Sequence, residues 1–259
     1  GRSMIELNGK KAIITGGAGG IGLAATRTFT KAGAEVIIAD INEEAGKKAA
    51  EETGATFIRC DVSSSQDVQK VIAAANGKLD ILYNNAGVYW NGRDGRITEI
   101  EEDNWEKIIA INLRSVYLFC KYSLPLLMKQ GGSIINTASS AGMIGIPNCD
   151  AYTATKGAIV QLTKSMAAEY GRYNVRVNCI SPAAIMTPMV KESNPPDSTF
   201  DENSFLNLRT PLRRYGTPEE IADLACYLAS DQATYLNGAI IAADGGITIN
   251  GDLSHPDKR

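Results

Sequence analysis

The sequence predicts an α/β fold, in which helices cover both faces of a doubly wound, mostly parallel sheet. Strand-like apolar segments alternate along the chain with segments of helical period, which is the βαβ rhythm of a parallel sheet. The first strand runs into a glycine-rich turn that opens a helix, as a phosphate-binding loop requires. With 259 residues, 44% hydrophobic content and no polar linker, we expect one domain over residues 4–251.

Composition excludes several classes of function. A net charge of −3 offers no broad positive field for nucleic acid, and the apolar runs are too short for a membrane span. We expect a soluble, cytoplasmic protein, in which residues 1–3 are a cloning remnant and residues 252–259 a polar tail.

The cysteines and the histidine argue against two common kinds of site. The five cysteines are scattered and form no C-x-x-C pair, so we expect reduced, mostly buried thiols rather than disulfides or a zinc site. The single histidine, His255, lies in the tail, which excludes a conventional Ser-His-Asp site in the body of the chain. No metal site is predicted, and proton transfer must fall to another residue type.

The first expected strand, at 11–15, leads into a glycine turn at 16–22. Glycines allow a tight turn and the close approach of a pyrophosphate, and the start of the helix supplies unpaired N–H groups. Two glycine spacings fit this turn: Gly17, Gly19 and Gly22 as G-x-G-x-x-G, and Thr15, Gly16, Gly20, Ile21 and Gly22 in a wider pattern.

The second expected strand, at 35–40, ends in an acidic residue. Asp40 lies 18 residues after Gly22, close to the spacing of a carboxylate that binds the adenosine ribose. No lysine or arginine stands within the glycine turn to neutralise a 2′-phosphate, so this carboxylate should repel NADP. The sequence therefore predicts NAD as the cofactor.

Two more strands, expected at 56–60 and 79–84 around a helix at 65–76, continue the parallel sheet. Asp61, at the end of the first, is expected either to bond the adenine amino group or to serve in a turn or helix cap. The second opens into Asn84-Asn85-Ala86-Gly87 at its carboxyl end, the edge of such sheets where ligands bind.

Two polar positions interrupt apolar elements farther along. A helix expected around 103–122 carries Asn112 on an apolar face, where an amide commonly bonds a nearby carbonyl or a buried water. The strand at 132–140 ends in Ser139 and Ser140, and a hydroxyl there can either donate to a substrate oxygen or serve in an ordinary turn.

Tyr152 and Lys156 stand four positions apart at the start of a helical pattern. One helical turn places both on the same face. A neighbouring cation favours the phenolate and lowers the pKa of a tyrosine, so the pair could exchange a proton with an alcohol.

Taken together, these motifs resemble the short-chain dehydrogenase/reductase family, over about residues 10–249. The matching motifs are Thr15-Gly16-x-x-x-Gly20-x-Gly22, Asn84-Asn85-Ala86-Gly87, Asn112, Ser139, Tyr152-x-x-x-Lys156, Pro182 with Thr187, and Asp244-Gly245-Gly246. The resemblance implies a single-domain, Rossmann-like fold, NAD as cofactor and a homotetramer.

The resemblance also implies catalytic roles. Tyr152 would be the acid/base, while Lys156 would lower its pKa and hold the nicotinamide ribose. Ser139 would bond the substrate oxygen, since the family places its serine 13 residues before the tyrosine, although Ser140 stays open as an alternative. Asn112 would anchor a proton relay through water to Lys156.

The cofactor contacts that the resemblance implies extend from the glycine turn to the loop around Pro182. They are Gly16, Gly20, Ile21, Gly22, Asp40, Asp61, Val62, Asn85, Ala86, Gly87, Tyr152, Lys156, Pro182, Ile185 and Thr187. Ala183 stands where the family usually has glycine, so the loop around the nicotinamide is expected to differ slightly in shape.

The last third of the chain is expected to form a strand at 175–180, a helix at 218–230 and a final strand at 238–242. Residues 189–208 are polar, contain proline and show no periodic pattern. They are expected to form a mobile lid over the substrate, or otherwise a solvated loop.

The activity expected is hydride transfer between NAD and a secondary alcohol or ketone, with Tyr152 as acid/base. Two alternatives stay open: a 3-oxoacyl-carrier-protein reductase, against which Asp40 and the negative charge count, and a non-catalytic NAD-binding regulator. The identity of the small-molecule substrate is open too. An apolar ring or chain would suit Tyr89, Trp90, Met143, Ile144, Ile146 and Cys149, whereas a carboxylated substrate would suit Arg93, Asp94 and Arg96.

Overall fold

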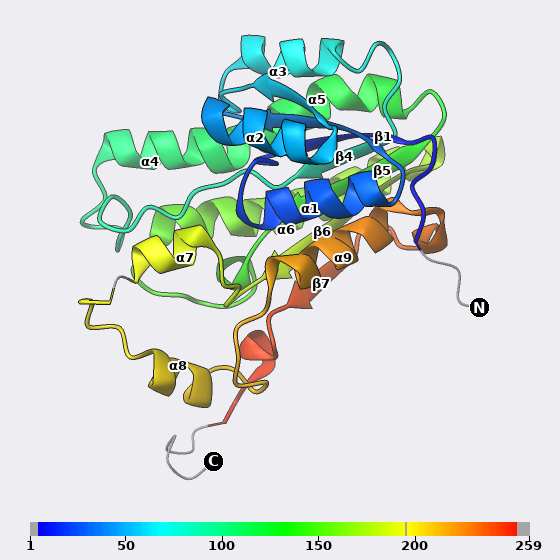
Figure 1. Cartoon of the computed structure of the whole chain (residues 1–259). Helices are drawn as coiled ribbons and strands as arrows, with labels where there is room; N and C mark the ends of the chain where they lie inside the picture. The colour runs from blue at the N-terminus through cyan, green and yellow to red at the C-terminus, as the bar shows by residue number, and fades with distance from the viewer. Residues whose placement is uncertain (1–4, 195, 253–259) are drawn as a thin grey trace.

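The computed structural model describes residues 5–194 and 196–252. Seven parallel strands form one sheet in the order β3-β2-β1-β4-β5-β6-β7, as a doubly wound fold requires (Figure 1). The strands are β1 (Lys11–Thr15), β2 (Glu35–Asp40), β3 (Thr56–Arg59), β4 (Ile81–Asn84), β5 (Gly132–Thr137), β6 (Val175–Pro182) and β7 (Ile240–Ala243). The predicted remnant at 1–3 and tail residues 253–259, with His255, lie outside the described residues.

Helices pack on both faces of the sheet. They are α1 (Gly20–Lys31), α2 (Glu43–Thr53), α3 (Ser65–Ala73), α4 (Glu102–Ile109), α5 (Ser115–Leu127), α6 (Asp150–Tyr170), α7 (Pro188–Ser193), α8 (Glu202–Leu208) and α9 (Pro218–Ala229). Side chains of α3, α5 and α6 form the core on one face, and those of α1, α2 and α9 form the core on the other. Within the described residues, no helix has the length and apolar character needed to cross a membrane.

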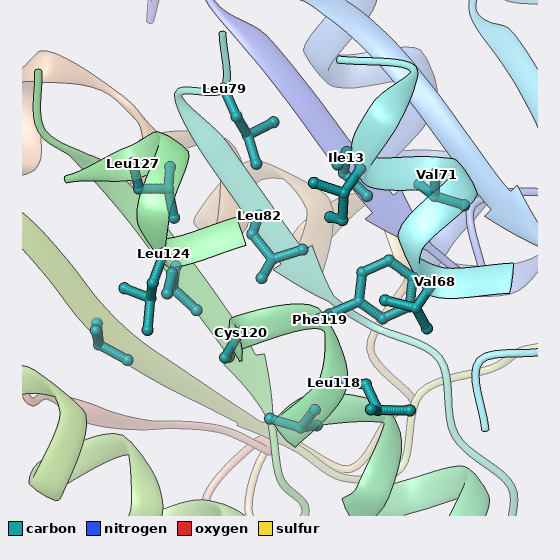
Figure 2. Packing of buried hydrophobic residues seen from close by; sticks show 14 of the residues in the cluster. Ile13, Val68, Val71, Leu79, Leu82, Leu118, Phe119, Cys120, Leu124 and Leu127 are labelled. Atoms are coloured by element: carbon teal, nitrogen blue, oxygen red, sulfur yellow. The ribbon is translucent and has the colours of Figure 1, made fainter. Parts of the chain in front are cut away.

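Side chains of the central strands alternate between the two faces of the sheet, so each face is covered by an apolar core. Neighbours in β1 bury their side chains in different cores: Ile13 lies with α3 and α5, whereas Ile14 lies with α1 and α9. Figure 2 shows Ile13 and Leu82 packed with Phe119 and Val68 on the first face. Continuous apolar strands of this kind are typical of parallel sheets covered by helices on both sides.

The order of the strands reverses between β1 and β4, which pair in parallel near the middle of the sheet. Successive strands add on one side from β1 to β3, and on the other side from β4 to β7. The connections leave the carboxyl ends of β1 and β4 in opposite directions, so a crevice opens there. This reversal places the glycine turn beside Asn85.

Two segments differ from the sequence-based prediction. The helix expected at 103–122 is α4 and α5 joined by a π-helical turn, Ala110–Arg114. Residues 189–208, expected to lack regular structure, contain α7 and α8. Each short helix begins at a side-chain N-cap. Thr187 accepts from the amide of Val190, and Asp201 accepts from that of Ser204.

Candidate active site

A cavity of about 670 Å³ runs along the carboxyl edge of the sheet and crosses the reversal between β1 and β4. It brings together almost every residue predicted to bind the cofactor: Gly16, Gly20, Ile21, Asp40, Asp61, Val62, Asn85, Ala86, Gly87, Tyr152, Lys156, Pro182, Ile185 and Thr187. Ser139 lines it as well. Two predicted residues, Gly22 and Asn112, do not line the cavity.

The glycine turn follows the wider of the two spacings. Gly16 and Gly20 adopt the left-handed region, with φ of +66° and +53°, which residues with a Cβ rarely enter. A Cβ on Gly22 would overlap the carbonyl oxygen of Gly16, so this position closes the turn against α1. Gly19 lines the cavity, and a Cβ placed on it would have no atom within 4 Å. The turn is thus a backbone cradle, open toward the space that a pyrophosphate would fill.

Thr15 links the carboxyl ends of β1 and β4 by hydrogen bonds. Its Oγ1 accepts hydrogen bonds from the amides of Asn85, at 3.0 Å, and Ala86, at 2.9 Å. The Asn85 side chain donates to the carbonyl of Gly16 at 3.3 Å. Sequence reasoning quoted Thr15 as part of a motif but gave it no function, because these partners lie about 70 positions away.

Asp40 is held beside the glycine turn at the end of β2. Its Oδ2 accepts from the amide of Ala18 and its Oδ1 from that of Asn42, both at 3.0 Å. The carboxylate is therefore oriented at the cavity wall, and each oxygen keeps a further lone pair for a ligand hydroxyl. Among the described residues that line the cavity, Lys156 is the only basic one.

Asp61 shows the turn role that the sequence left open. Its Oδ1 accepts from the amide of Ser63 at 3.0 Å and from the Ser63 hydroxyl at 2.6 Å, just ahead of α3. Asp61 also lines the cavity, so its contact with an adenine stays a prediction.

Tyr152 and Lys156 lie on one face of α6, as their spacing predicts. Lys156 Nζ is 5.4 Å from the centroid of the Tyr152 ring and donates to the carbonyl of Thr137 at 3.1 Å. Burial lowers the pKa of Lys156 to about 8. Burial also raises the pKa of Tyr152 to about 12, against a smaller lowering by its hydrogen bond with Ser139. The pKa of the phenol is therefore raised, not lowered as the spacing to Lys156 predicts, and the largest cause is burial, which helical spacing alone could not reveal.

Ser139, rather than Ser140, faces the site. Ser139 is buried and lines the cavity, and its Oγ accepts from the amide of Ala141 at 2.9 Å. Ser140 instead begins a short 3₁₀ turn and is absent from the lining. This settles the placement of the two hydroxyls, while the contact of Ser139 with a substrate stays a prediction.

Asn112 is fully buried within the π-helical turn. Its Oδ1 accepts from the amide of Val88 at 2.7 Å, and its Nδ2 donates to the carbonyl of Val88 at 2.9 Å. A Cβ added to Gly87 would lie 3.4 Å from both Asn112 Oδ1 and Lys156 Nζ, so the missing side chain leaves a gap shared by the two groups. The bonds to Val88 are those of a structural amide, and the relay to Lys156 stays a prediction.

Apolar side chains line the end of the cavity next to Tyr152. Tyr89 packs edge-on against the Tyr152 ring, with 5.3 Å between centroids, and the apolar side chains of Trp90 and Val190 line the same cavity. Tyr89, Trp90 and Val190 are called the apolar wall below, and its two aromatic residues the aromatic wall. Sequence reasoning missed Val190, because it stands in the unpatterned segment. The other apolar residues expected near the substrate are absent from the lining: Met143, Ile144, Ile146 and Cys149.

Of the charged residues next to this wall, Arg93 stacks on the wall residue Trp90, whereas Arg96 pairs with a residue outside it. The Cζ atom of Arg93 lies 4.9 Å from the centroid of the Trp90 ring, and Arg96 Nη2 lies 2.7 Å from a carboxylate oxygen of Glu99. Neither arginine lines the cavity. In the loop beyond Pro182, Ala184 adopts a left-handed φ of +54°.

All five cysteines are free and buried, as expected. Within the parts of the chain that the structure describes, no group of three His, Cys, Asp or Glu side chains could hold a metal ion.

Comparison with known proteins agrees with this geometry. The family model described as Enoyl-(Acyl carrier protein) reductase matches residues 16–248. The chain is 38% identical to 2,5-dichloro-2,5-cyclohexadiene-1,4-diol dehydrogenase of Sphingobium indicum over 252 residues, which cover 95% of this chain and 99% of the relative.

A second relative is the 3-oxoacyl-[acyl-carrier-protein] reductase of Chlamydia muridarum, 40% identical over 249 residues that cover 92% of this chain and 97% of the relative. A solved structure of a short chain dehydrogenase/reductase family protein superposes with a TM-score of 0.85 at 33% identity, covering 95% of this chain and all of that one. The chain therefore belongs to the short-chain dehydrogenase/reductase family of oxidoreductases.

Proposed function

We propose that the protein is an NAD-dependent oxidoreductase that moves a hydride between the cofactor and a secondary alcohol or ketone. One observation carries the proposal: Ser139, Tyr152 and Lys156 share a single cavity with the glycine turn and with Asp40. When bound, the nicotinamide accepts or donates the hydride. The protein's own residues must then bind both partners, exclude water and move one proton.

Tyr152 is the proposed acid/base. In the oxidation of an alcohol its phenolate takes the hydroxyl proton, and in reduction its hydroxyl returns that proton. Ser139 donates a hydrogen bond to the substrate oxygen and stabilises it as negative charge develops. Because burial raises the pKa of Tyr152 to about 12, the phenolate requires a nearby cation, and the buried Lys156 ammonium is the one available in the described lining.

Asp40 supports NAD over NADP. Its carboxylate is fixed by two amides at the cavity wall, where it could accept from ribose hydroxyls but would repel a 2′-phosphate. Gly16, Gly20 and Gly22 would provide the pyrophosphate cradle.

An uncharged, ring-shaped alcohol is the substrate class that we propose. Tyr89, Trp90 and Val190 line the cavity with Tyr152, and Lys156 is the only basic side chain among the described residues of its lining. A substrate carboxylate would therefore be desolvated without a dedicated partner. The relative from Sphingobium indicum is named for a cyclic diol, which agrees with this class.

A 3-oxoacyl-carrier-protein reductase is the second candidate, favoured by the 40% identity to the Chlamydia muridarum enzyme. Asp40 and the net charge of −3 count against it, since an acidic carrier protein would seek a basic docking surface. The lid role of 189–208, the cytoplasmic location and the homotetramer remain proposals. The free, buried thiols suit a reducing compartment.

The substrate class is tested with a pair of alcohols that share one ring. We expect kcat/KM for cyclohexanol to exceed that for 3-hydroxycyclohexanecarboxylate by roughly 10-fold or more, because the carboxylate would lose water without gaining a partner. Absorbance of the reduced nicotinamide measures both. Equal or better turnover of the carboxylated alcohol would reject the uncharged class.

The acid/base role is tested by Tyr152→Phe. This variant keeps the ring that packs on Tyr89 but loses the titratable oxygen, so kcat should fall by at least ~10²-fold while NAD still binds. Turnover within threefold of wild type would remove Tyr152 from the mechanism. NAD binding without turnover of any alcohol by the wild type would favour the non-catalytic regulator.

The cofactor preference is tested by Asp40→Asn, which keeps the size of the side chain and one acceptor oxygen but removes the charge. Wild type should prefer NAD over NADP by roughly 10²-fold in kcat/KM, and the variant should narrow this ratio. Asp61→Asn, a second carboxylate of the same cavity, should leave the ratio unchanged. If the wild type uses both cofactors equally, or if Asp40→Asn leaves the ratio of kcat/KM for NAD and NADP unchanged, Asp40 does not bind the adenosine ribose.

A further inference from the structure

The first turn of α6 is held by a residue from outside the helix. Asp94, on the loop between β4 and α4, accepts from the amide of Ala151 through Oδ1, at 3.0 Å, and from that of Tyr152 through Oδ2, at 2.8 Å. The carbonyl of Gly95 accepts a third bond, from the amide of Asp150 at 2.8 Å. The helix's own N-cap residue, Cys149, makes no side-chain bond to the amides of the first turn. Asp94 therefore replaces a local cap for the turn that carries Tyr152.

The same loop carries the aromatic wall of the substrate end. The amide of Asp94 donates to the carbonyl of Trp90 at 2.9 Å, and Tyr89 packs against the Tyr152 ring. At its other end the loop begins at Val88, whose two backbone polar groups bond the amide side chain of the π-helical turn. The segment is therefore tied at both ends, and Asp94 is the residue whose side chain bonds the amides of α6.

We propose that Asp94 is a positioning residue, which fixes the Tyr152 phenol relative to the aromatic wall. The proposal rests on the proposed role of Tyr152 as acid/base. Tyr152 is the third residue of α6, so a shift of the first turn moves its hydroxyl directly. A carboxylate that accepts two amide bonds at a helix N-terminus is favoured by charge and by the helix dipole.

Geometry makes this role sensitive to small changes. A catalytic group displaced by about 1 Å can lose about 10²-fold in rate. Asp94 does not line the cavity, so it need not contact the substrate or the cofactor to act. Its effect should therefore appear in kcat, while the affinity for NAD should not change.

The test compares Asp94→Ala, Asp94→Asn and the control Asp150→Asn in the full-length protein. Asp150 is an acidic residue of the same first turn, and its carboxylate takes no part in these bonds. We expect Asp94→Ala to lower kcat for cyclohexanol by about 10-fold or more, with the Kd for NAD within about twofold of wild type. Asp94→Asn keeps one acceptor oxygen, so it should recover part of the loss, and the control should behave as wild type.

Amide hydrogen exchange supplies a readout that is independent of activity. In Asp94→Ala, peptides covering 88–96 and 149–156 should both exchange faster, and in Asp150→Asn neither should. Unchanged exchange in Asp94→Ala would overturn the link between loop and helix. Faster exchange with wild-type kcat would overturn the positioning role.

Failure of the proposed acid/base role would be recognised separately, by an active Tyr152→Phe variant. The exchange measurements would keep their meaning in that case, because they report the bonds of Asp94 and not the chemistry.

Discussion

Desolvation of Tyr152 and Lys156, the first half-buried and the second buried, is the constraint on which the proposed chemistry of the site depends. The same desolvation acts on two groups of opposite charge type, so it raises the pKa of the phenol to about 12 and lowers that of the ammonium to about 8. Both groups are thereby pushed toward their neutral forms. In the proposed mechanism, the phenolate that takes the alcohol proton would need the cationic form of Lys156 nearby.

The fold supplies the surroundings that this constraint requires. Reversal of the strand order between β1 and β4 opens a crevice, and Thr15 fastens the two strand ends across it. The helix α6 crosses the far end of the same crevice, where Asp94 holds its first turn. The glycine turn, Tyr152 and the aromatic wall thus come from segments far apart in sequence, and the sheet edge brings them into one cavity.

The sequence predicted features whose signals are local. The βαβ rhythm, the glycine turn and the shared face of Tyr152 and Lys156 follow from spacings of a few residues, and the structure places them as expected. Features set by tertiary packing were not predicted. They are the bonds of Asp94 to amides 57 and 58 positions away, the π-helical turn at Asn112, and the burial that raises the phenol pKa. The short helices α7 and α8 were not predicted, because their sequences show no apolar periodicity.

The most direct measurement is the pH profile of kcat/KM for alcohol oxidation in wild type and in Lys156→Ala, at saturating NAD. The rate should rise with pH as the phenolate forms. Removing the cation disfavours the phenolate, so the apparent pKa should move upward in the variant, by about one pH unit or more. A midpoint that does not move, in a variant that still binds NAD, would show that another group sets the titration and would contradict the account.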